Sequence, residues 1–358
     1  MTPSPLRRSP LERLRGHHVG SYGLPVLAAL LFLVFSLLLP QTFPTRDNVS
    51  ALLSNQAVPA VLALGATIPI ATGRFDLSIG YGLGLAHVMV MHLVVTEGRP
   101  WPAACLVVVC GGAAVGALTG VIVEFGQIDS FIATLGTGSM MYAVTGWITG
   151  GARIVPGPEG LPAGFTALYD ARFLGLPLPA FYVLGVAAVL WVVLERLPAG
   201  RYLYVIGSNP RAAAAIGIPT RAYCVAAFAG SGLVTGFAGV LLAAQQQTGN
   251  PSTGLDYLLP AFVGALLGST TIRPGRANAL GTVVAVAVLA VGLAGIGQLG
   301  AQFWATPLFN GGTLLIAVGL AGWAARRRLG AGGAASRRPH APEPPAQEPP
   351  APVQAGPS

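Results

Sequence analysis

Long stretches of this sequence carry no charge. Residues 24–39 and 103–123 contain no Asp, Glu, Lys, Arg or His, and only 9% of the whole chain is charged. A soluble domain carries about a quarter charged residues, because its surface must face water. We therefore expect an all-α polytopic membrane protein, whose helices satisfy their own backbone hydrogen bonds in lipid.

Ten apolar runs of about 16 to 24 residues are long enough to cross a hydrocarbon core of about 30 Å. They lie near residues 24–39, 51–72, 77–96, 102–123, 131–150, 178–195, 222–244, 257–271, 278–297 and 304–324. The third run is rich in glycine, which leaves open whether it is a continuous or a broken helix. No small-residue cleavage site follows the first run, so we interpret it as a retained anchor.

The arginines favour one orientation of these runs, because cytoplasmic loops near membrane spans are enriched in Lys and Arg. Ten spans with both termini in the cytoplasm leave only Arg46, Arg99, Arg153 and Arg172 outside. If the third run did not cross, the arginines of 196–221 and of 326–328 would face outward. The sequence therefore predicts cytoplasmic N and C termini.

Three parts of the chain differ in composition. We expect residues 1–22 to be a basic cytoplasmic leader and residues 23–325 to form the membrane domain. Residues 326–358 are dominated by Gly, Ala and Pro, without a cluster of bulky aliphatic side chains to offset the entropy of ordering. A disordered cytoplasmic tail is the expectation for them.

Composition also excludes several functions. All 20 basic residues are arginine, so neither a phosphate-loop lysine nor a Schiff-base lysine exists here. The cysteines Cys105, Cys110 and Cys224 lie inside apolar runs, and His87 and His92 are off a single helical face, so we expect no metal site and no cofactor. The arginines form no basic face interleaved with aromatic residues, which argues against a nucleic-acid partner.

Small residues recur inside two runs, GGAAVGALTG at 111–120 and GSGLVTGFAG at 230–239. Such residues let helix backbones approach closely in a membrane. Tight packing of the bundle is the main interpretation, and a gating hinge is the alternative.

The loop between the sixth and seventh runs, ERLPAGRYLYVIGSNPRAAAAIGIPTR at 195–221, contains a helix of its own. Asn209 is a good N-cap, Pro210 suits the first turn, and Gly217 with Pro219 supplies the stop. One interpretation is a solvated basic loop. Against it, Tyr202, Tyr204, Val205, Ile206 and Ile216 are too apolar for a loop with nothing to dock on, which indicates a cytosolic partner.

Four motifs resemble one family in the family's own order. They are FDLSIG at 75–80, DSFIATLGTGSMMYAVTGWITGG at 129–151, GRYLYVIGSNPRAAAAIGI at 200–218 and LLGSTTIRPGRANALGT at 266–282. The chain is similar to the permease subunits of ribose-, xylose- and galactoside-type ATP-binding-cassette importers over residues 45–325. It departs from the family pattern at Arg74 and Phe75 and at residues 270–273.

This resemblance implies that the helix of 209–217 is a coupling helix that fits a groove on a separate ATPase subunit. The residues it would assign to this loop are Gly200, Arg201, Tyr202, Gly207, Asn209, Pro210, Arg211, Ala214 and Gly217. It also implies a second permease copy, identical or different, an external solute-binding protein and a bacterial inner-membrane location. No residue of this chain would be catalytic, and the cargo would be a sugar or a similar small polar solute.

Candidate residues for the translocation pathway are Asn55, Phe75, Asp76, Ser78, Thr134, Thr137 and Ser139. Each has a structural alternative. Asp76 is placed to cap the helix that follows it, and membrane threonines commonly bond back to their own helix. Amides such as Asn55 can join helices to one another.

Two other functions remain as alternatives. A stand-alone secondary transporter should contain inverted repeats with paired broken segments, and we find no convincing repeat. A membrane-embedded enzyme would need a nucleophile with its base, or a cluster of metal ligands, and neither pattern is present.

Overall fold

The computed structural model describes residues 10–316 and residue 319, and the side chains from residue 22 onward. The helices before the long outer connection are α1 (Pro10–Leu38), α2 (Arg46–Asn55), α3 (Ala57–Ala71), α4 (Ser78–Met91), the π-helical turn η1 (His92–Thr96), α5 (Trp101–Gly126) and α6 (Ser130–Thr149). After it come α7 (Ala163–Asp170), the hairpin β1 (Arg172–Phe173) and β2 (Leu176–Pro177), α8 (Leu178–Glu195), α9 (Pro198–Ser208), α10 (Pro210–Ala215), α11 (Thr220–Gln246), the 3-10 turn η2 (Thr253–Tyr257), α12 (Leu258–Gly268) and α13 (Ala279–Gln298). Residues 305–316 are also helical.

The helical, multi-spanning class predicted from composition is confirmed. Five helices are long and apolar enough to cross a membrane, and a sixth span is present if α2 and α3 are counted together. Helices also occupy the other predicted runs, as the shorter apolar segments Tyr22–Leu38 and Thr253–Gly268, as α6 with its several Ser, Thr and Gly residues, and as 305–316. Ten crossings therefore stay a prediction. The leader up to residue 9 and the tail of 326–358 lie outside the described residues.

The break in the bundle lies in the second run and not in the glycine-rich third run. α4 is continuous through its glycines and passes directly into η1. In contrast, α2 and α3 meet at Gln56 with a bend of 41°. Pro59 explains this bend, because it cannot donate to the carbonyl of Asn55 and its ring clashes with that carbonyl.

The contacts between segments that join the helices fall into two groups, one at each end of the helical bundle. At one end, Arg74 pairs with Glu124, and Tyr204 bonds the backbone of Ala277. At the other, the hydroxyl of Tyr169 donates to the carbonyl of Ser54 (2.6 Å), Gln298 bonds Asn48 (2.7 Å) and residue 154 pairs with residue 249. Each of these contacts joins segments that the ten-span scheme places on one side. We call the first the inner end and the second the outer end.

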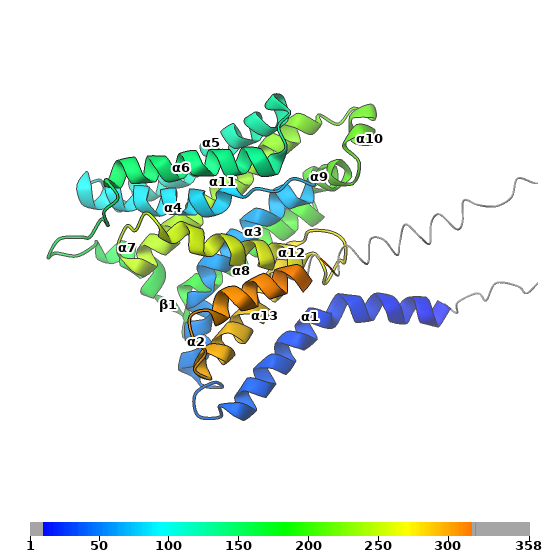
Figure 1. The fold of residues 1–358 in the computed structure, drawn as a ribbon, viewed down its shortest axis with the longest axis horizontal. Coiled ribbons are helices and arrows are strands. Elements are labelled where there is room, and N and C mark those ends of the chain that lie inside the picture. Colours follow the sequence, from blue (N-terminus) through cyan, green and yellow to red (C-terminus); the bar gives the residue numbers. More distant parts are fainter. Residues whose placement is uncertain (1–9, 317–318, 320–358) are drawn as a thin grey trace, which may run out of the picture.

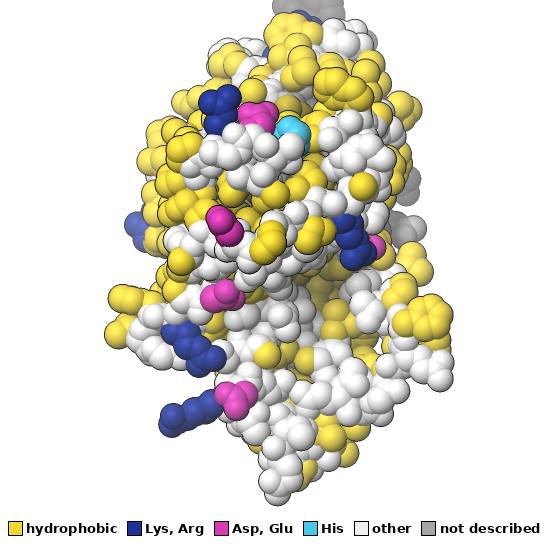
Figure 2. Space-filling view, turned by 90° about the vertical axis from the view of Figure 1, so that its left-hand side faces the viewer, with side chains coloured by type: hydrophobic (Ala, Val, Ile, Leu, Met, Phe, Trp, Pro, Cys, Tyr) yellow, Lys and Arg dark blue, Asp and Glu magenta, His cyan; other side chains and the backbone are white. Residues whose placement is uncertain are grey.

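Figure 1 shows α9 and α10 at the inner end of the bundle, and α7 at the outer end. The outer end faces the viewer in Figure 2, where arginine and acidic side chains are interspersed among apolar and uncharged ones. Arg99 there pairs with Glu97 (3.2 Å). The long connection of 151–177 is anchored, because Phe165 is fully buried with its ring edge-on to Trp101.

The core forms around α11, which packs against α3, α4 and α5. The two small-residue runs face each other there: a Cβ on Gly112 would lie 3.1 Å from Cα of Gly236, and one on Gly116 3.1 Å from Cα of Gly232. The tight packing predicted for residues 111–120 and 230–239 is confirmed. Both α5 and α11 continue through these glycines without interruption.

Glycines of α4 serve the same purpose on its other side. A Cβ on Gly80 would lie 2.7 Å from Cβ of Leu258, and Gly84 lies against Gly254. The 3-10 turn η2 and the start of α12 therefore rest directly on α4, and just before them the backbone N–H of Asn250 donates to Nε2 of His87 (3.0 Å). Backbone that is not α-helical is tolerated beside the membrane helices here because protein surrounds it.

Candidate functional site

The inner end carries the short helix that the sequence predicts. Oδ1 of Asn209 accepts from the backbone N–H of Ala212 (3.0 Å), and Pro210 is the first residue of α10. The helix ends at Ala215, and Gly217 follows with φ of 84°, a left-handed conformation that suits glycine. The predicted cap, first turn and stop are all confirmed.

The residues before this helix are themselves helical, which the sequence reasoning did not anticipate. α9 buries Leu203 and Ile206, and Ile206 packs against Ala213 of α10 and Cys224 of α11. Part of the apolar content of this loop is therefore docked within the chain itself, which corrects the expectation that all of it awaits a partner. Ile216 remains 73% exposed, and the exposed residues around it include Arg201, Tyr202, Val205, Arg211, Ala214 and Gly217.

Two glycines fix the position of α9. Gly200 lies against the backbone of Leu194, where a Cβ has no room, so α9 folds back sharply on the end of α8. Gly207 lies equally close to the carbonyl oxygen of Ala71, at the end of α3. Gly200 and Gly207, two of the three glycines that the resemblance assigned to the coupling loop, therefore allow close approach of backbone to backbone.

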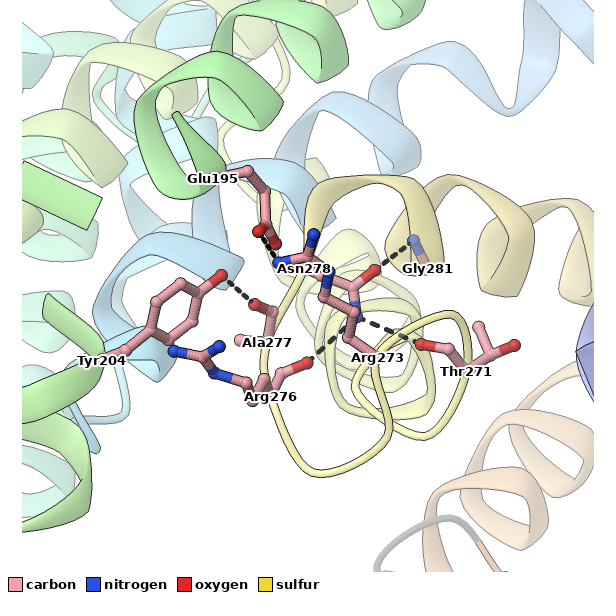
Figure 3. Close-up of polar contacts among 8 residues, drawn as sticks. All are labelled: Glu195, Tyr204, Thr271, Arg273, Arg276, Ala277, Asn278 and Gly281. Carbon is pink, nitrogen blue, oxygen red and sulfur yellow. Dashed lines mark hydrogen bonds and ion pairs between the residues drawn. The ribbon is translucent and has the colours of Figure 1, made fainter. Parts of the chain in front are cut away.

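The connection between α12 and α13, residues 269–278, forms the platform beneath α9 (Figure 3). The hydroxyl of Tyr204 donates to the carbonyl of Ala277 (2.7 Å), and the guanidinium of Arg276 lies 4.1 Å from the centre of the Tyr204 ring. Burial raises the pKa of the Tyr204 hydroxyl above its ordinary value, so this hydroxyl remains a donor. Arg273 forms an ion pair with the buried Glu195 at the end of α8.

Asn278 holds this connection in shape. Its Oδ1 accepts from the backbone N–H of Gly281 (2.7 Å) and caps α13, while its Nδ2 lies within 3.2 Å of the carbonyl oxygens of Gly268, Thr271 and Arg276. Sequence reasoning missed Glu195 and Asn278, and it expected Tyr204 to dock on a partner and not on Ala277 of this chain. Two signals were available: Glu195 is an acid at the end of an apolar run, and Asn278 stands just before a helical run, as an N-cap does.

Asp76 connects the start of α4 to α11. Its Oδ1 accepts from the backbone N–H (3.1 Å) and the hydroxyl (2.5 Å) of Ser78, and its Oδ2 accepts from the hydroxyl of Ser231 (3.0 Å). Asp76 therefore bonds the first residue of α4, although the N-cap position itself is Leu77. The carboxyl is almost fully buried, and no arginine forms an ion pair with it within residues 10–316.

The hydroxyl groups predicted on α6 bond back to their own helix. Thr134 is fully buried, donates to the carbonyl of Ser130 (2.7 Å) and accepts from the backbone N–H of Leu77 (3.1 Å). Thr137 and Ser139 lie within hydrogen-bond distance of the carbonyls of residues 134 and 135. These bonds match the structural alternative for α6, and contact of these residues with a solute stays a prediction.

A cavity of about 230 Å³ lies between α4, α5, α6 and α11. Asp76 and Ser78 line it, together with Thr235, whose buried hydroxyl has no partner among the described residues. Phe75 is not in this wall but packs against Phe262, with ring centres 6.1 Å apart, and Asn55 is exposed at the end of α2. Of the predicted pathway residues, the structure brings only Asp76 and Ser78 to this cavity.

In the part of the chain that the structure describes, no group of three or more His, Cys, Asp or Glu side chains is placed to hold a metal ion. The described features are a helical bundle of membrane-spanning length, an exposed helix at the inner end and a buried carboxyl beside a cavity. Together they define a polytopic membrane transport protein of the permease class.

The chain belongs to the family described as "branched-chain amino acid transport system / permease component", whose model matches residues 48–318. It is 31% identical over 297 residues to a ribose import permease of Bacillus subtilis (82% of this chain, 90% of the relative) and 27% identical over 299 residues to the D-allose transport system permease of Escherichia coli (84% and 90%). It is also 30% identical to a ribose import permease of Haemophilus influenzae over 260 residues (73% and 80%). The resemblance indicated by the four motifs is confirmed. No solved structure matches the chain.

Proposed function

We propose that this chain is the membrane-spanning subunit of a bacterial inner-membrane importer powered by a separate ATPase, with a sugar or a similar small polar solute as its cargo. The chain lacks the lysine that a phosphate loop requires, so hydrolysis falls to a partner. Its relatives are named for ribose and allose, which favours a monosaccharide. A second permease copy and an external solute-binding protein complete the assembly.

The observation that carries this proposal is the form of α10. The helix is capped and terminated by its own residues, and Ala213 anchors it to α9 and α11. Its outer face nevertheless presents exposed Ala214, Arg211 and the neighbouring Ile216. A helix that is packed on one face and that exposes apolar side chains beside one arginine on the other suits a groove on a cytosolic protein.

The translocation path in this proposal passes the cavity beside Asp76. A carboxyl and unpaired hydroxyl groups inside a membrane protein mark solute routes, because polar groups at this depth otherwise cost free energy. Asp76 and Thr235 supply these groups at the cavity wall. Ten spans with both termini in the cytoplasm place α10 on the ATPase side.

The decisive experiment is reconstitution in lipid vesicles. The purified chain should transport no monosaccharide alone, and ATP-dependent uptake should require a cognate ATPase subunit and a solute-binding protein. Sustained uptake by the chain without a second protein would contradict the proposal and favour a secondary transporter. A panel of pentoses and hexoses, titrated against the binding protein, would identify the cargo.

A further inference from the structure

The inner end contains a contact between parts of the chain far apart in the sequence: the end of α8 and α9 on one side, and residues 269–278 on the other. Three interactions make it: the hydrogen bond from Tyr204 to Ala277, the stacking of Arg276 on Tyr204, and the ion pair of Arg273 with Glu195. We call this set the α9 latch (Figure 3). The coupling loop and the helices α12 and α13 are thereby joined by both polar and charged bonds.

On one side of the latch, residues 269–278 are bonded to both α12 and α13, so the three segments should move as a unit. Asn278 bonds the last residue of α12, the middle of the connection and the first turn of α13. Gly281 also lies against the carbonyl oxygen of Gly268, so the two helices are in direct backbone contact there. A displacement of Ala277 must therefore displace the inner ends of α12 and α13 together.

On the other side of the latch, α9 is packed to α10, so the two short helices should move together. Ile206 is fully buried against Ala213, so the two short helices share one small core. The half-buried Tyr204 projects from the same α9, one turn before Ser208. A force on the exposed face of α10 thus reaches Tyr204 through packed side chains.

Because the side chain of Glu195 is buried, its ion pair with Arg273 should contribute more to the free energy of this contact than an exposed ion pair would. The side chain of Glu195 is 7% exposed and that of Arg273 is 50% exposed. A buried carboxylate that loses its partner is left uncompensated, whereas an exposed pair contributes little. The connection is therefore held to α8 as well as to α9.

We propose that Tyr204, Arg273 and Glu195 are positioning residues for transport, which transmit movement of α10 to α12 and α13. This inference rests on the proposed function, in which α10 contacts the ATPase. Breaking the α9 latch should leave the ATPase bound and hydrolysing ATP while its movement no longer reaches the helices.

The test compares Tyr204→Phe, Arg273→Gln and Glu195→Gln in the reconstituted complex of permease, ATPase and binding protein. Tyr204→Phe removes only a hydroxyl and keeps the ring that packs beneath Arg276, so it is the variant least disturbing to folding. Arg99→Gln, which breaks the Arg99–Glu97 pair at the outer end, is the matched control. Co-purified ATPase, ATP hydrolysis and uptake are measured for each.

We expect uptake per ATP hydrolysed to fall about tenfold in the latch variants, the size of a typical coupling free energy, and to stay unchanged in Arg99→Gln. The double swap Glu195→Arg with Arg273→Glu should regain part of the lost uptake. Uptake and hydrolysis that fall in equal proportion, or that both stay at the wild-type level, would overturn the inference. An ATPase that does not co-purify with the wild-type chain would instead overturn the proposed function.

Discussion

Gly112 of α5 and Gly232 of α11 face each other so closely that a Cβ on either would collide with the carbonyl oxygen of the other. Without water to drive association inside a membrane, such close packing is a main source of helix–helix stability. This pair lies in the most extensive helix–helix contact among the described residues, beside the cavity that Asp76 lines.

Replacing Gly232 by Leu should therefore destabilise the bundle. The side chain has no space to enter, so α5 and α11 must separate, at a cost of about 1–3 kcal/mol or more. Thermal unfolding of the purified protein in detergent would measure the loss. Gly111→Leu is the matched control, because nothing lies within 4 Å of a Cβ at Gly111. Equal unfolding temperatures for the two variants would contradict the packing described here.

Replacing Ala214 by Glu should abolish coupling without unfolding the permease. Ala214 is exposed on α10, and an exposed substitution of this kind changes stability by only about 0.5 kcal/mol. A charge in the centre of an apolar docking face leaves that charge desolvated, which weakens binding. We expect normal insertion, loss of uptake and loss of the ATP hydrolysis that solute stimulates.

The control for this variant is Ala152→Glu, which places the same charge at an exposed alanine of the outer end. Wild-type uptake by the Ala214→Glu variant would remove α10 from the docking surface. Equal losses in both variants would show that the effect does not depend on the inner end.

Asp76→Asn separates the two roles of this carboxyl. A capping role alone predicts a stability loss of about 1 kcal/mol with transport retained in the folded fraction. A pathway role predicts that uptake falls at least fivefold in protein that is folded and assembled, a loss of about 1 kcal/mol or more in transport free energy. We expect the second result, measured as uptake normalised to the amount of permease in the vesicles.

Asp129→Asn is the matched control for Asp76→Asn. Asp129 also bonds the start of its helix, through the backbone N–H of Phe131 (2.9 Å), but it does not line the cavity between α4 and α11. Similar uptake by the two variants would assign Asp76 a structural role only.

The sequence predicted those structural features that depend only on residues close together in the chain. The cap, proline and glycine of residues 209–217 are read from a few adjacent positions, and the structure has them as predicted. α9 was missed because its sequence, GRYLYVIG, has weak helical propensity and is held by the burial of Leu203 and Ile206. Tertiary packing decides such a helix.

The glycines of α4 show a second limit of sequence reasoning. A glycine-rich run is compatible with a break, with flexibility or with close packing, and only the position of Gly254 against Gly84 shows that packing is the reason. The bend at Gln56 had a signal, Pro59, three residues later. The α9 latch joins Glu195 to Arg273 across 78 residues, and no local pattern indicates such a pair.

The orientation of the chain can be tested with two exposed side chains at opposite ends. Leu174, at the tip of the hairpin of β1 and β2, is 83% exposed, and Ile216, beside α10, is 73% exposed. In a chain whose Cys105, Cys110 and Cys224 are replaced by alanine, Leu174→Cys should react with a membrane-impermeant maleimide in intact spheroplasts. Ile216→Cys should react only after the membrane is opened, because positive-inside topology places residues 196–221 in the cytoplasm.

A reporter fused after Leu329 should likewise be cytoplasmic if ten spans cross. Labelling of Ile216→Cys in intact spheroplasts would show the opposite orientation, in which α10 faces outward and cannot contact a cytosolic ATPase.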